Sequence, residues 1–350
     1  MNYENDESQS SGFTIVELLV VIVVIGILAA ITIVSYSGIS QRATVASLTS
    51  DLDSASRQLK LYQVTSDTSS YPTSFDVSNC PIPADNARCL KPSSGISYTS
   101  YVFNNSITPQ GFCITAAKDL TIYRVTNDSA PVQGDCLEYG QVLHLDAGNT
   151  SSYPSPFNGT AWADLSGNNN NGTLINGVVY SGANGGIFNF DGATSYVNIP
   201  GNSTLEPQSV TIVAWINMST SAPTARNIFL TKWNGYSCEV EATTRRPYFR
   251  LNGPGDVYSS DNLVLGNWYQ FVGTFEKGVG AKIYLNGALK GSRSTPAGIS
   301  YTANSVLNIG RYAGGVYFKG SISDVRIYNR ALGVDEINQL FNAIHDRYGV

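Results

Sequence analysis

The sequence predicts two modules: an α+β module, in which a long N-terminal helix packs on a small antiparallel sheet, and a following all-β sandwich. Three observations support this prediction. An apolar run at residues 13–34 continues into an amphipathic stretch that reaches residue 62. Alternating segments with four clustered cysteines fill residues 63–139. From residue 140 to 350, β-type runs recur about every ten residues between Gly, Asn, Asp and Pro, which is typical of a sandwich or jelly roll.

The apolar run at residues 13–34 is long enough to cross a membrane. As a helix rising about 1.5 Å per residue it would extend about 33 Å, against about 30 Å for the hydrocarbon core of a bilayer. Only Thr14, Glu17 and Thr32 carry polar side chains there. A carboxylate is costly in this environment, so we expect Glu17 to pair with a cation. Cleavage after Gly12 would supply one, the new amino terminus of Phe13.

Residues 12–62 resemble the N-terminal segment of type IV pilins and type II secretion pseudopilins. The resemblance rests on a polar leader that ends at Gly12, on Phe13, and on Glu17 at the fifth position of the apolar run. It implies that residues 1–12 are a prepilin leader, that a prepilin peptidase cleaves after Gly12 and methylates Phe13, and that Glu17 guides docking into a filament. The leader departs from the family in having neither Lys nor Arg.

The composition indicates an exported protein. Charged residues make up 13% of the chain, about half of the usual share of roughly 25%. The net charge is −5, and no basic stripe is present that could hold a phosphate backbone, so we expect no nucleic-acid partner. Together with the resemblance, this predicts a precursor in the inner or cytoplasmic membrane and a mature form in an extracellular filament or on the cell surface.

Residues 13–62 are predicted to form one helix, because no proline occurs before Pro72. Its second half has an apolar face with steps of four and three residues, which we expect to pack on the small sheet. The residues of this face are Leu48, Leu52, Ala55, Leu59 and Tyr62.

Residues 63–139 are predicted to form a small cap with three or four antiparallel strands. The segments ISYTSYVFN, GFCITAA and LTIYRVTN alternate apolar and polar residues, as half-buried strands do. Cysteines are typical of an oxidising compartment. Of three possible pairings we favour Cys80–Cys89 with Cys113–Cys136, because both close local loops; the second also resembles the disulfide loop of pilins. Structural zinc is the alternative for these four cysteines. Cys238 is expected to be a buried free thiol.

Residues 141–343 resemble laminin-G-like, concanavalin-A-like jelly-roll domains. The resemblance rests on VLHLDAGN, WADLSGNNNNGTL, FNFDGATSYVNIP, VTIVAWI, GNWYQFVGTFE, KIYLNG and FKGSISDVRIYNRALGVDEI, which occur in the order seen in that family. It implies that residues 140–350 form a concanavalin-A-like jelly roll that binds glycans or proteins, often near a calcium ion. Some relatives are glycosidases.

The residues of this domain do not indicate an enzyme. A retaining glycosidase needs two carboxyl groups about 5–5.5 Å apart. Glu239 and Glu241 are the only closely spaced pair of the right type, and we interpret them as solvated charges on a strand. His144, one of only two histidines, alternates with leucines and is expected to be a strand residue. No nucleophile-elbow, zinc-protease or phosphate-loop motif is present.

A calcium site is predicted at the Gly- and Asn-rich loop that begins at Asp164. Calcium binds six to eight oxygen atoms from carboxylates, amides, carbonyls and water. The loop could supply Asp164, Asn168 and Asn170, with Asp191 or Asp324 from neighbouring segments. The alternative is a turn in which the Asp164 side chain only caps its own backbone.

Aromatic side chains in or beside loops are the candidate glycan contacts, because an exposed ring can stack on a sugar. These are Trp233, Tyr236, Tyr258 and Tyr312. For each of them a purely structural role is the alternative. Trp215 and Trp268 lie in alternating strand patterns and are expected in the core.

Taken together, the sequence predicts a minor or tip subunit of a type IV pilus-like filament that displays a glycan- or protein-binding domain for adhesion. Other pilins and the prepilin peptidase are the expected partners. Three alternatives remain open at this stage: a type II secretion pseudopilin, a pilin-tethered carbohydrate-active enzyme, and a sandwich that serves only as a structural spacer.

Overall fold

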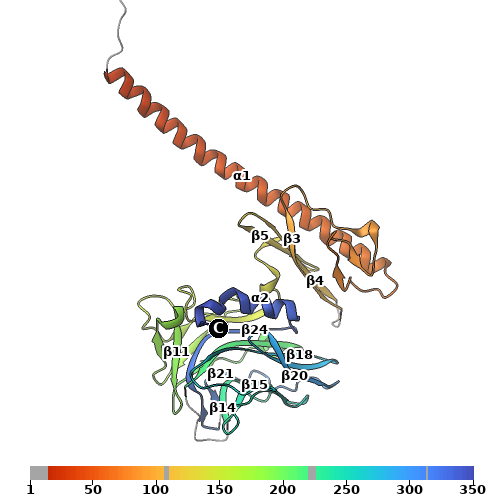
Figure 1. Ribbon diagram of the computed structural model, residues 1–350, viewed down its shortest axis with the longest axis vertical. Coiled ribbons are helices and arrows are strands. Elements are labelled where there is room, and N and C mark those ends of the chain that lie inside the picture. The colour runs from red at the N-terminus through yellow and green to blue at the C-terminus, as the bar shows by residue number, and fades with distance from the viewer. Residues whose placement is uncertain (1–14, 106–109, 220–225, 313) are drawn as a thin grey trace, which may run out of the picture. The chain divides into compact units, whose positions relative to one another are not determined.

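The computed structural model describes residues 15–105, 110–219, 226–312 and 314–350. The chain divides into two compact units, Met1–Cys136 and Leu137–Val350. The division falls a few residues before the predicted boundary at residue 139. Each unit has its own hydrophobic core, and each is described by itself below (Figure 1).

The first unit is built on one long helix, α1 (Ile15–Thr65). It continues to Thr65 rather than ending at residue 62. Its second half buries the predicted apolar face, whereas the described aliphatic side chains between residues 15 and 28 are exposed. Glu17 lies in this helix, but its side chain is outside the described part, as are Gly12 and Phe13 entirely.

Within the described residues, the structure contains no helix that is long and apolar enough to cross a membrane. The segment predicted to do so, residues 13–34, includes positions that lie outside the described part of the chain.

The cap of the first unit is a four-stranded antiparallel sheet packed on α1. Its strands, in the order β3–β4–β5–β6, are Ser97–Asn104, Gly111–Lys118, Thr121–Thr126 and Val132–Gln133. A small hairpin of β1 (Ser74–Phe75) and β2 (Pro81–Ile82) lies beside it. The disulfides join Cys80 to Cys89 and Cys113 to Cys136, the pairing favoured from the sequence, which leaves no thiolate set for structural zinc.

Asp51 of α1 fixes the loop that leads into β3. Its carboxylate accepts hydrogen bonds from the backbone N–H of Ser93 at 2.6 Å and from the Ser93 hydroxyl at 2.8 Å. The Tyr98 hydroxyl donates to the backbone carbonyl of Asp51. Helix and sheet are thus joined by hydrogen bonds to a nearly buried carboxylate as well as by the apolar contacts of the core.

The second unit is an antiparallel sandwich of two eight-stranded sheets. Sheet I has the order β10–β11–β24–β13–β18–β19–β20, with β7 also paired to β24. Its strands are β7 (Gln141–Asp146), β10 (Val179–Ser181), β11 (Ile187–Asp191), β13 (Val210–Met218), β18 (Trp268–Glu276), β19 (Gly280–Leu285), β20 (Ala288–Ser294) and β24 (Lys319–Tyr328).

Sheet II has the order β17–β16–β15–β14–β21–β12–β9–β8. Its strands are β8 (Ala161–Trp162), β9 (Gly172–Ile175), β12 (Tyr196–Ile199), β14 (Arg226–Lys232), β15 (Tyr236–Glu241), β16 (Pro247–Leu251), β17 (Val257–Tyr258) and β21 (Leu307–Ile309). A short hairpin, β22 (Arg311–Tyr312) and β23 (Val316–Tyr317), lies against β14.

The two sheets enclose one large core of alternating side chains. The sheets approach closely at Gly273, where an added Cβ would lie 2.8 Å from the Phe249 ring. Cys238 lies in this core as a free, buried thiol whose pKa burial raises well above its usual value. This location matches the expectation for Cys238 and leaves the thiol without a solvent path.

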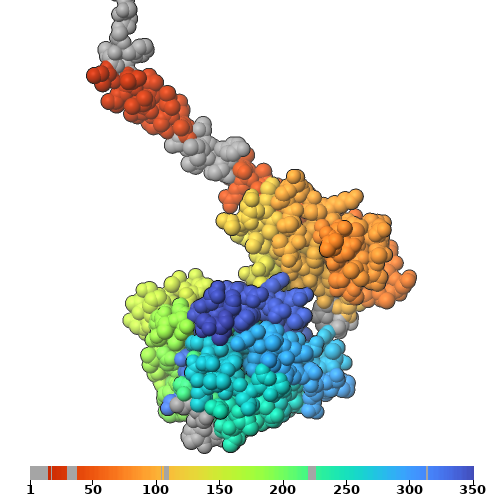
Figure 2. Space-filling view, in the orientation of Figure 1, coloured from red at the N-terminus to blue at the C-terminus, as the bar shows by residue number. Residues whose placement is uncertain are grey.

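The outer face of sheet I is covered by α2 (Val334–Ile344) and the following turn η5 (His345–Tyr348). Figures 1 and 2 show this C-terminal segment, in dark blue, lying across the sandwich on the side of β24. Tyr348 stacks on Trp215 with ring centres 4.1 Å apart, and Trp268 lies beside both. The two tryptophans are therefore buried, as expected, but beneath α2 rather than between the sheets. Among the residues that the structure describes, no α-helix covers the outer face of sheet II.

We predict that Leu52→Ala will lower the free energy of unfolding of the first unit by about 2–5 kcal/mol, because it opens a cavity in a closed core. Calorimetry of the full chain in detergent should show one transition moving and the transition of the sandwich staying in place. Leu61→Ala, at an exposed position of the same helix, is the matched control. Equal shifts of both transitions would contradict the two separate cores.

Candidate functional site

The outer face of sheet II carries the polar and aromatic residues that are candidates for ligand binding. In β15, Tyr236, Cys238 and Val240 belong to the core, so the alternating residues Ser237, Glu239 and Glu241 point to the other face. The same alternation places Tyr248 and Arg250 of β16 on that face, beside Glu239 and Ser237 in the strand register.

Glu239 is the centre of a buried cluster on this face. Its carboxylate is fully buried and accepts hydrogen bonds from the hydroxyls of Ser237 and Tyr248. Arg226 lies 3.4 Å from it and Arg250 lies 3.7 Å from it. Burial, followed by the hydrogen bond to Glu239, raises the pKa of Tyr248 far above its usual value, so the phenol stays protonated.

The prediction that Glu239 is a solvated charge is therefore wrong. Strand alternation correctly placed it on the outer face, but Tyr248 and two arginines cover it. Glu241 is more accessible. Its side chain accepts from Thr244 and pairs with Arg246 at 3.2 Å, and these contacts lower its pKa.

A cavity of about 260 Å³ lies next to this cluster. Ser237, Arg250 and Tyr312 line it, and the loop from Asn252 to Asp256 forms part of its wall. Arg250 pairs with Asp256 at 3.2 Å, which holds the guanidinium at the cavity. The lining offers hydroxyl, amide, guanidinium and carboxylate groups beside the ring of Tyr312, a combination suited to a small polar ligand with hydroxyl groups.

A buried lysine lies under the same cavity. The Nζ atom of Lys232 is 2.9 Å from Glu206 Oε1 and donates to the backbone carbonyl of Ser305. The Lys232 charge is thus neutralised within the fold. It helps to position the end of β14, where Thr231 lines the cavity, and the following turn, which carries Asn234.

Three of the four predicted glycan-contact residues lie at this face. Tyr312 lines the cavity, and its ring centre is 5.4 Å from that of Trp233. Tyr258 is 38% exposed and stacks on Tyr248 with ring centres 5.0 Å apart. Arg246 lies over the Tyr258 ring.

Tyr236 does not fit the predicted role of a stacking residue. Although its atoms border the cavity, it is only 2% exposed, and its hydroxyl donates to the backbone carbonyl of Leu205. It begins β15 and points into the core because strand alternation assigns it to the same side as Cys238.

The Asp164 loop is held by its own hydrogen bonds. Asp164 accepts from the backbone N–H groups of His144, Ser166 and Asn170 and from the Ser166 hydroxyl. The Asn170 amide donates to the backbone carbonyl of Val142 and to Thr204, and its oxygen accepts from Asn202. The Asn168 amide donates to the backbone carbonyl of Gln141. These contacts correspond to the alternative of a self-capped turn; a calcium ion here stays a prediction.

Asp191 is likewise occupied by its own loop. Burial raises its pKa, but hydrogen bonds from the backbone N–H groups of Ser195, Thr194 and Ala193 outweigh this and hold the pKa well below its usual range.

Asp324 lies in a different place, in an ion-pair network between β7 and β24. Its carboxylate contacts Arg326 at 2.8 Å and His144 Nε2 at 3.2 Å, and Asp146 lies nearby, paired with Arg347 at 2.9 Å. Among the described residues, His144, Asp146 and Asp324 form the one group with metal-ligand spacing. Because two arginines already pair with the carboxylates, the arrangement is that of a structural ion network. It contains neither Asp164 nor Asp191.

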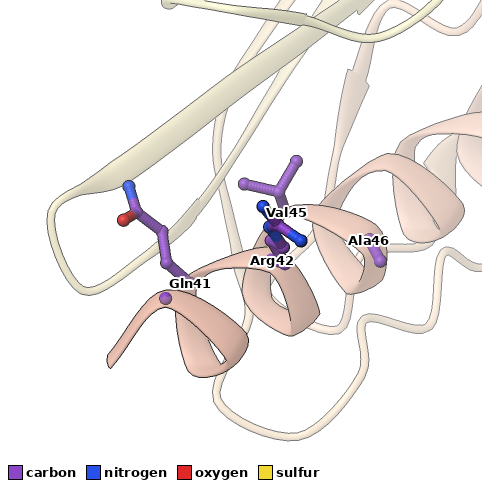
Figure 3. Close-up of a pocket in the computed structure, with 5 residues that line it drawn as sticks. Gln41, Arg42, Val45 and Ala46 are labelled. Atoms are coloured by element: carbon purple, nitrogen blue, oxygen red, sulfur yellow. The ribbon is translucent and has the colours of Figure 1, made fainter. Parts of the chain in front are cut away.

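A second hollow, of about 470 Å³, lies on the surface of α1 in the first unit. Figure 3 shows Gln41, Arg42, Val45 and Ala46 along a single helix. With Gly38 they are the described residues that line it. A ligand site is normally enclosed on several sides, so this hollow is less suitable than the cavity on sheet II.

Sequence analysis missed Arg250 and Asp256 as parts of the site and considered Glu239 only as a solvated charge. A usable signal existed: in PYFRL, alternation places Tyr248 and Arg250 on one face, and the following NGPGD segment is a Gly- and Pro-rich loop that ends in a carboxylate. Which loop folds back over which strand is not visible in the sequence.

Comparison with protein families separates the two modules. Residues 8–33 match the prokaryotic N-terminal methylation motif, and residues 191–338 match the concanavalin A-like lectin/glucanases superfamily. The chain is thus a fusion of a prepilin N-terminus and a lectin-like domain. This confirms both resemblances: a pilin-type N-terminal segment and a lectin-type domain occur in one chain. A search of curated proteins gives no match.

Solved structures similar to the chain include two binding domains and one domain of an arabinanase. The binding domain of botulinum neurotoxin DC in complex with SialylT is 15% identical, with a TM-score of 0.47 over 59% of this chain and 52% of that one. The binding domain of Paraclostridial Mosquitocidal Protein 1 is 18% identical, with a TM-score of 0.48 over 59% and 53%. Domain 4 of AbnA, an arabinanase from Geobacillus stearothermophilus, in complex with arabinotriose, is 18% identical, with a TM-score of 0.45 over 57% and 97%.

The chain thus spans about half the length of the two toxin domains. At these identities and TM-scores the similarities do not identify a ligand for this protein.

We predict that Asp324→Asn will lower the free energy of unfolding of the sandwich by about 3–5 kcal/mol near neutral pH, because it leaves Arg326 buried without its partner. Burial acts to raise the pKa of Asp324, but Arg326 and His144 overcome it and lower the pKa. The stabilisation by this carboxylate is therefore complete above its unfolded pKa of about 3.9 and is lost as the pH falls below that value.

Denaturant titrations between pH 7 and pH 2 would test this prediction. The variant should lose part of the acid dependence of the wild type. Asp346→Asn, at a fully solvated carboxylate, is the control and should behave like wild type. An Asp324→Asn protein with the wild-type pH profile would contradict the assignment.

Proposed function

We propose that the protein is a minor subunit, placed at the tip, of a type IV pilus-like filament, and that its sandwich binds glycans for adhesion. The observation that carries this proposal is the combination of a prepilin methylation motif with a lectin-like domain in which sheet II has a polar cavity beside Tyr312. Membrane insertion of the precursor, processing by a prepilin peptidase and assembly with other pilins follow from the motif.

The location at the tip is proposed on the basis of size. The second unit adds about 210 residues to a pilin-like subunit, a bulk that would crowd neighbouring subunits along a filament wall. The exposed aliphatic side chains between residues 15 and 28 need a membrane or neighbouring helices to cover them. Glu17 and the amino terminus of Phe13 are the proposed assembly pair.

We also propose that the sandwich does not act as an enzyme. Glu239 is enclosed by Tyr248, Arg226 and Arg250, and Glu241 is paired with Arg246. Neither is placed as a free acid or nucleophile. Release of reducing sugars from a bound polysaccharide would contradict this and would favour a tethered carbohydrate-active enzyme.

We predict that immunogold labelling of the sandwich will mark filament ends. We also expect a Gly12→Glu variant to retain its leader and therefore to give no labelled filaments. Mass spectrometry of the wild type should find a methylated Phe13 as the first residue. Ser11→Ala, next to the cleavage point, is the control and should be processed normally. Labelling along the whole filament would contradict the tip location. Processed protein that supports secretion without surface filaments would favour a pseudopilin.

We predict that Tyr312→Ala will weaken glycan binding about tenfold, because a stacked aromatic ring contributes roughly 1–1.5 kcal/mol. Tyr258→Ala, an exposed tyrosine on the same face but outside the cavity, is the matched control and should change binding little. Glycan arrays with the full chain in detergent, run with calcium and again with chelator, would measure both variants. Loss of binding with chelator would establish the calcium dependence predicted from the sequence.

A stronger effect of Tyr258→Ala than of Tyr312→Ala would move the site from the cavity to the sheet edge. Binding of no glycan under either condition would overturn the glycan proposal and favour a protein ligand or a structural spacer.

A further inference from the structure

Arg311 of β22 is a half-buried cation with no partner among the described residues. Its guanidinium carbon lies 4.5 Å from the ring centre of Tyr196 and 5.8 Å from that of Tyr317. Its Nε–H is buried and meets no hydrogen-bond acceptor. By contrast, the other arginines on the outer face of sheet II that are described above, Arg226, Arg246 and Arg250, each pair with a carboxylate.

The two tyrosine rings do not satisfy the N–H donors of the Arg311 guanidinium. A ring face attracts the charge by about 0.5–2 kcal/mol but offers no oxygen atom to the N–H groups. A buried donor without an acceptor costs about 1–3 kcal/mol, and more when it is charged. An arginine kept in such a position is a candidate for binding an oxyanion, because its planar fork of donors matches a carboxylate or sulfate group.

The position of Arg311 is fixed by the base of its hairpin. The backbone N–H of Gly310 donates to the carbonyl of Phe229, and the N–H of Phe318 donates to the carbonyl of Gly310. Gly310 has φ +81°, and an added Cβ would lie 2.6 Å from the Phe190 ring. The residue that precedes Arg311 therefore has to be glycine, and the arginine is presented by an anchored hairpin.

The same hairpin connects Arg311 to the cavity. Tyr312 is the next residue and lines the cavity, while Tyr317 pairs with Arg311 across the hairpin. Tyr196 lies in β12 and points to the outer face, because its neighbours Val197 and Ile199 belong to the core. The domain thus has a cavity with internally paired charges and, on the hairpin that contributes Tyr312 to it, a guanidinium between two tyrosines without a carboxylate partner in the described part of the chain.

We propose that Arg311, with Tyr196 and Tyr317, forms a subsite for the carboxylate or sulfate group of an acidic saccharide. This inference rests on the proposed glycan-binding function and deepens it. The guanidinium receives the oxyanion, the tyrosine rings contact the adjoining sugar, and the neighbouring cavity takes a neutral part of the same chain. A purely neutral glycan would leave Arg311 unpaired.

The test compares each acidic probe with its neutral counterpart. The full chain in detergent would be titrated with oligogalacturonate and its methyl ester, and with dextran sulfate and dextran. We expect the acidic member of at least one pair to bind at least tenfold more tightly. Arg311→Gln should remove this preference and leave binding of the neutral member unchanged, and Arg311→Lys should restore part of it. Lys282→Gln, which removes the same charge from an exposed position on sheet I, is the control.

Several outcomes would overturn the inference. Equal binding of acidic and neutral probes by the wild type would overturn it while the proposed function stands. So would an equal loss of preference in Lys282→Gln, which would indicate a general charge effect. A failure of Arg311→Gln to change the preference, in protein with the wild-type melting temperature, would do the same. Binding of no saccharide, acidic or neutral, would overturn the proposed function and the inference with it.

Discussion

The sandwich depends on the pairing of its first strand, β7, with its last, β24. These strands are about 180 residues apart in the chain, yet Asp146 lies opposite Asp324 and His144 opposite Arg326. The entropy of closing so long a loop grows only slowly with its length, and the buried ion network between the strands supplies specific contacts. Arg330 completes the closure, since it donates to the backbone carbonyl of Tyr139 and pairs with Glu336 of α2.

This closure also decides which face can receive a ligand. Because α2 and η5 follow directly after β24, their apolar residues cover sheet I and stack on Trp215 and Trp268. Sheet II has no corresponding helix in the described part of the chain. Its outer face instead carries charges that are mostly paired, with Glu239 buried among hydrogen bonds. Such internal pairing lets a surface be polar and rigid before a ligand arrives, which reduces the cost of binding.

The first unit depends on the long helix α1 rather than on the pairing of distant strands. A single helix provides exposed aliphatic residues at one end and a buried face at the other. The exposed end requires an external apolar partner, while the buried end has the small sheet, two disulfides and the hydrogen bonds of Asp51. A sheet this small buries little apolar surface alone, so the helix is its main support. One chain thereby joins an assembly element to a separately folded binding element.

The sequence by itself determined the order of the modules, the long helix, the cysteine pairing and the sandwich class, because these depend on local periodicity and short loops. It also indicated aromatic residues in or beside loops, among them Tyr312 and Tyr258, because turn-forming residues mark where strands end. Only the tertiary structure decided what covers each face. Burial of Glu239 and Tyr236, the self-capping of Asp164 and the separation of Asp324 from it depend on contacts between distant strands. The alternation of residues along a strand indicates which face of the sheet a side chain lies on. Packing between distant segments determines which residues cover that face.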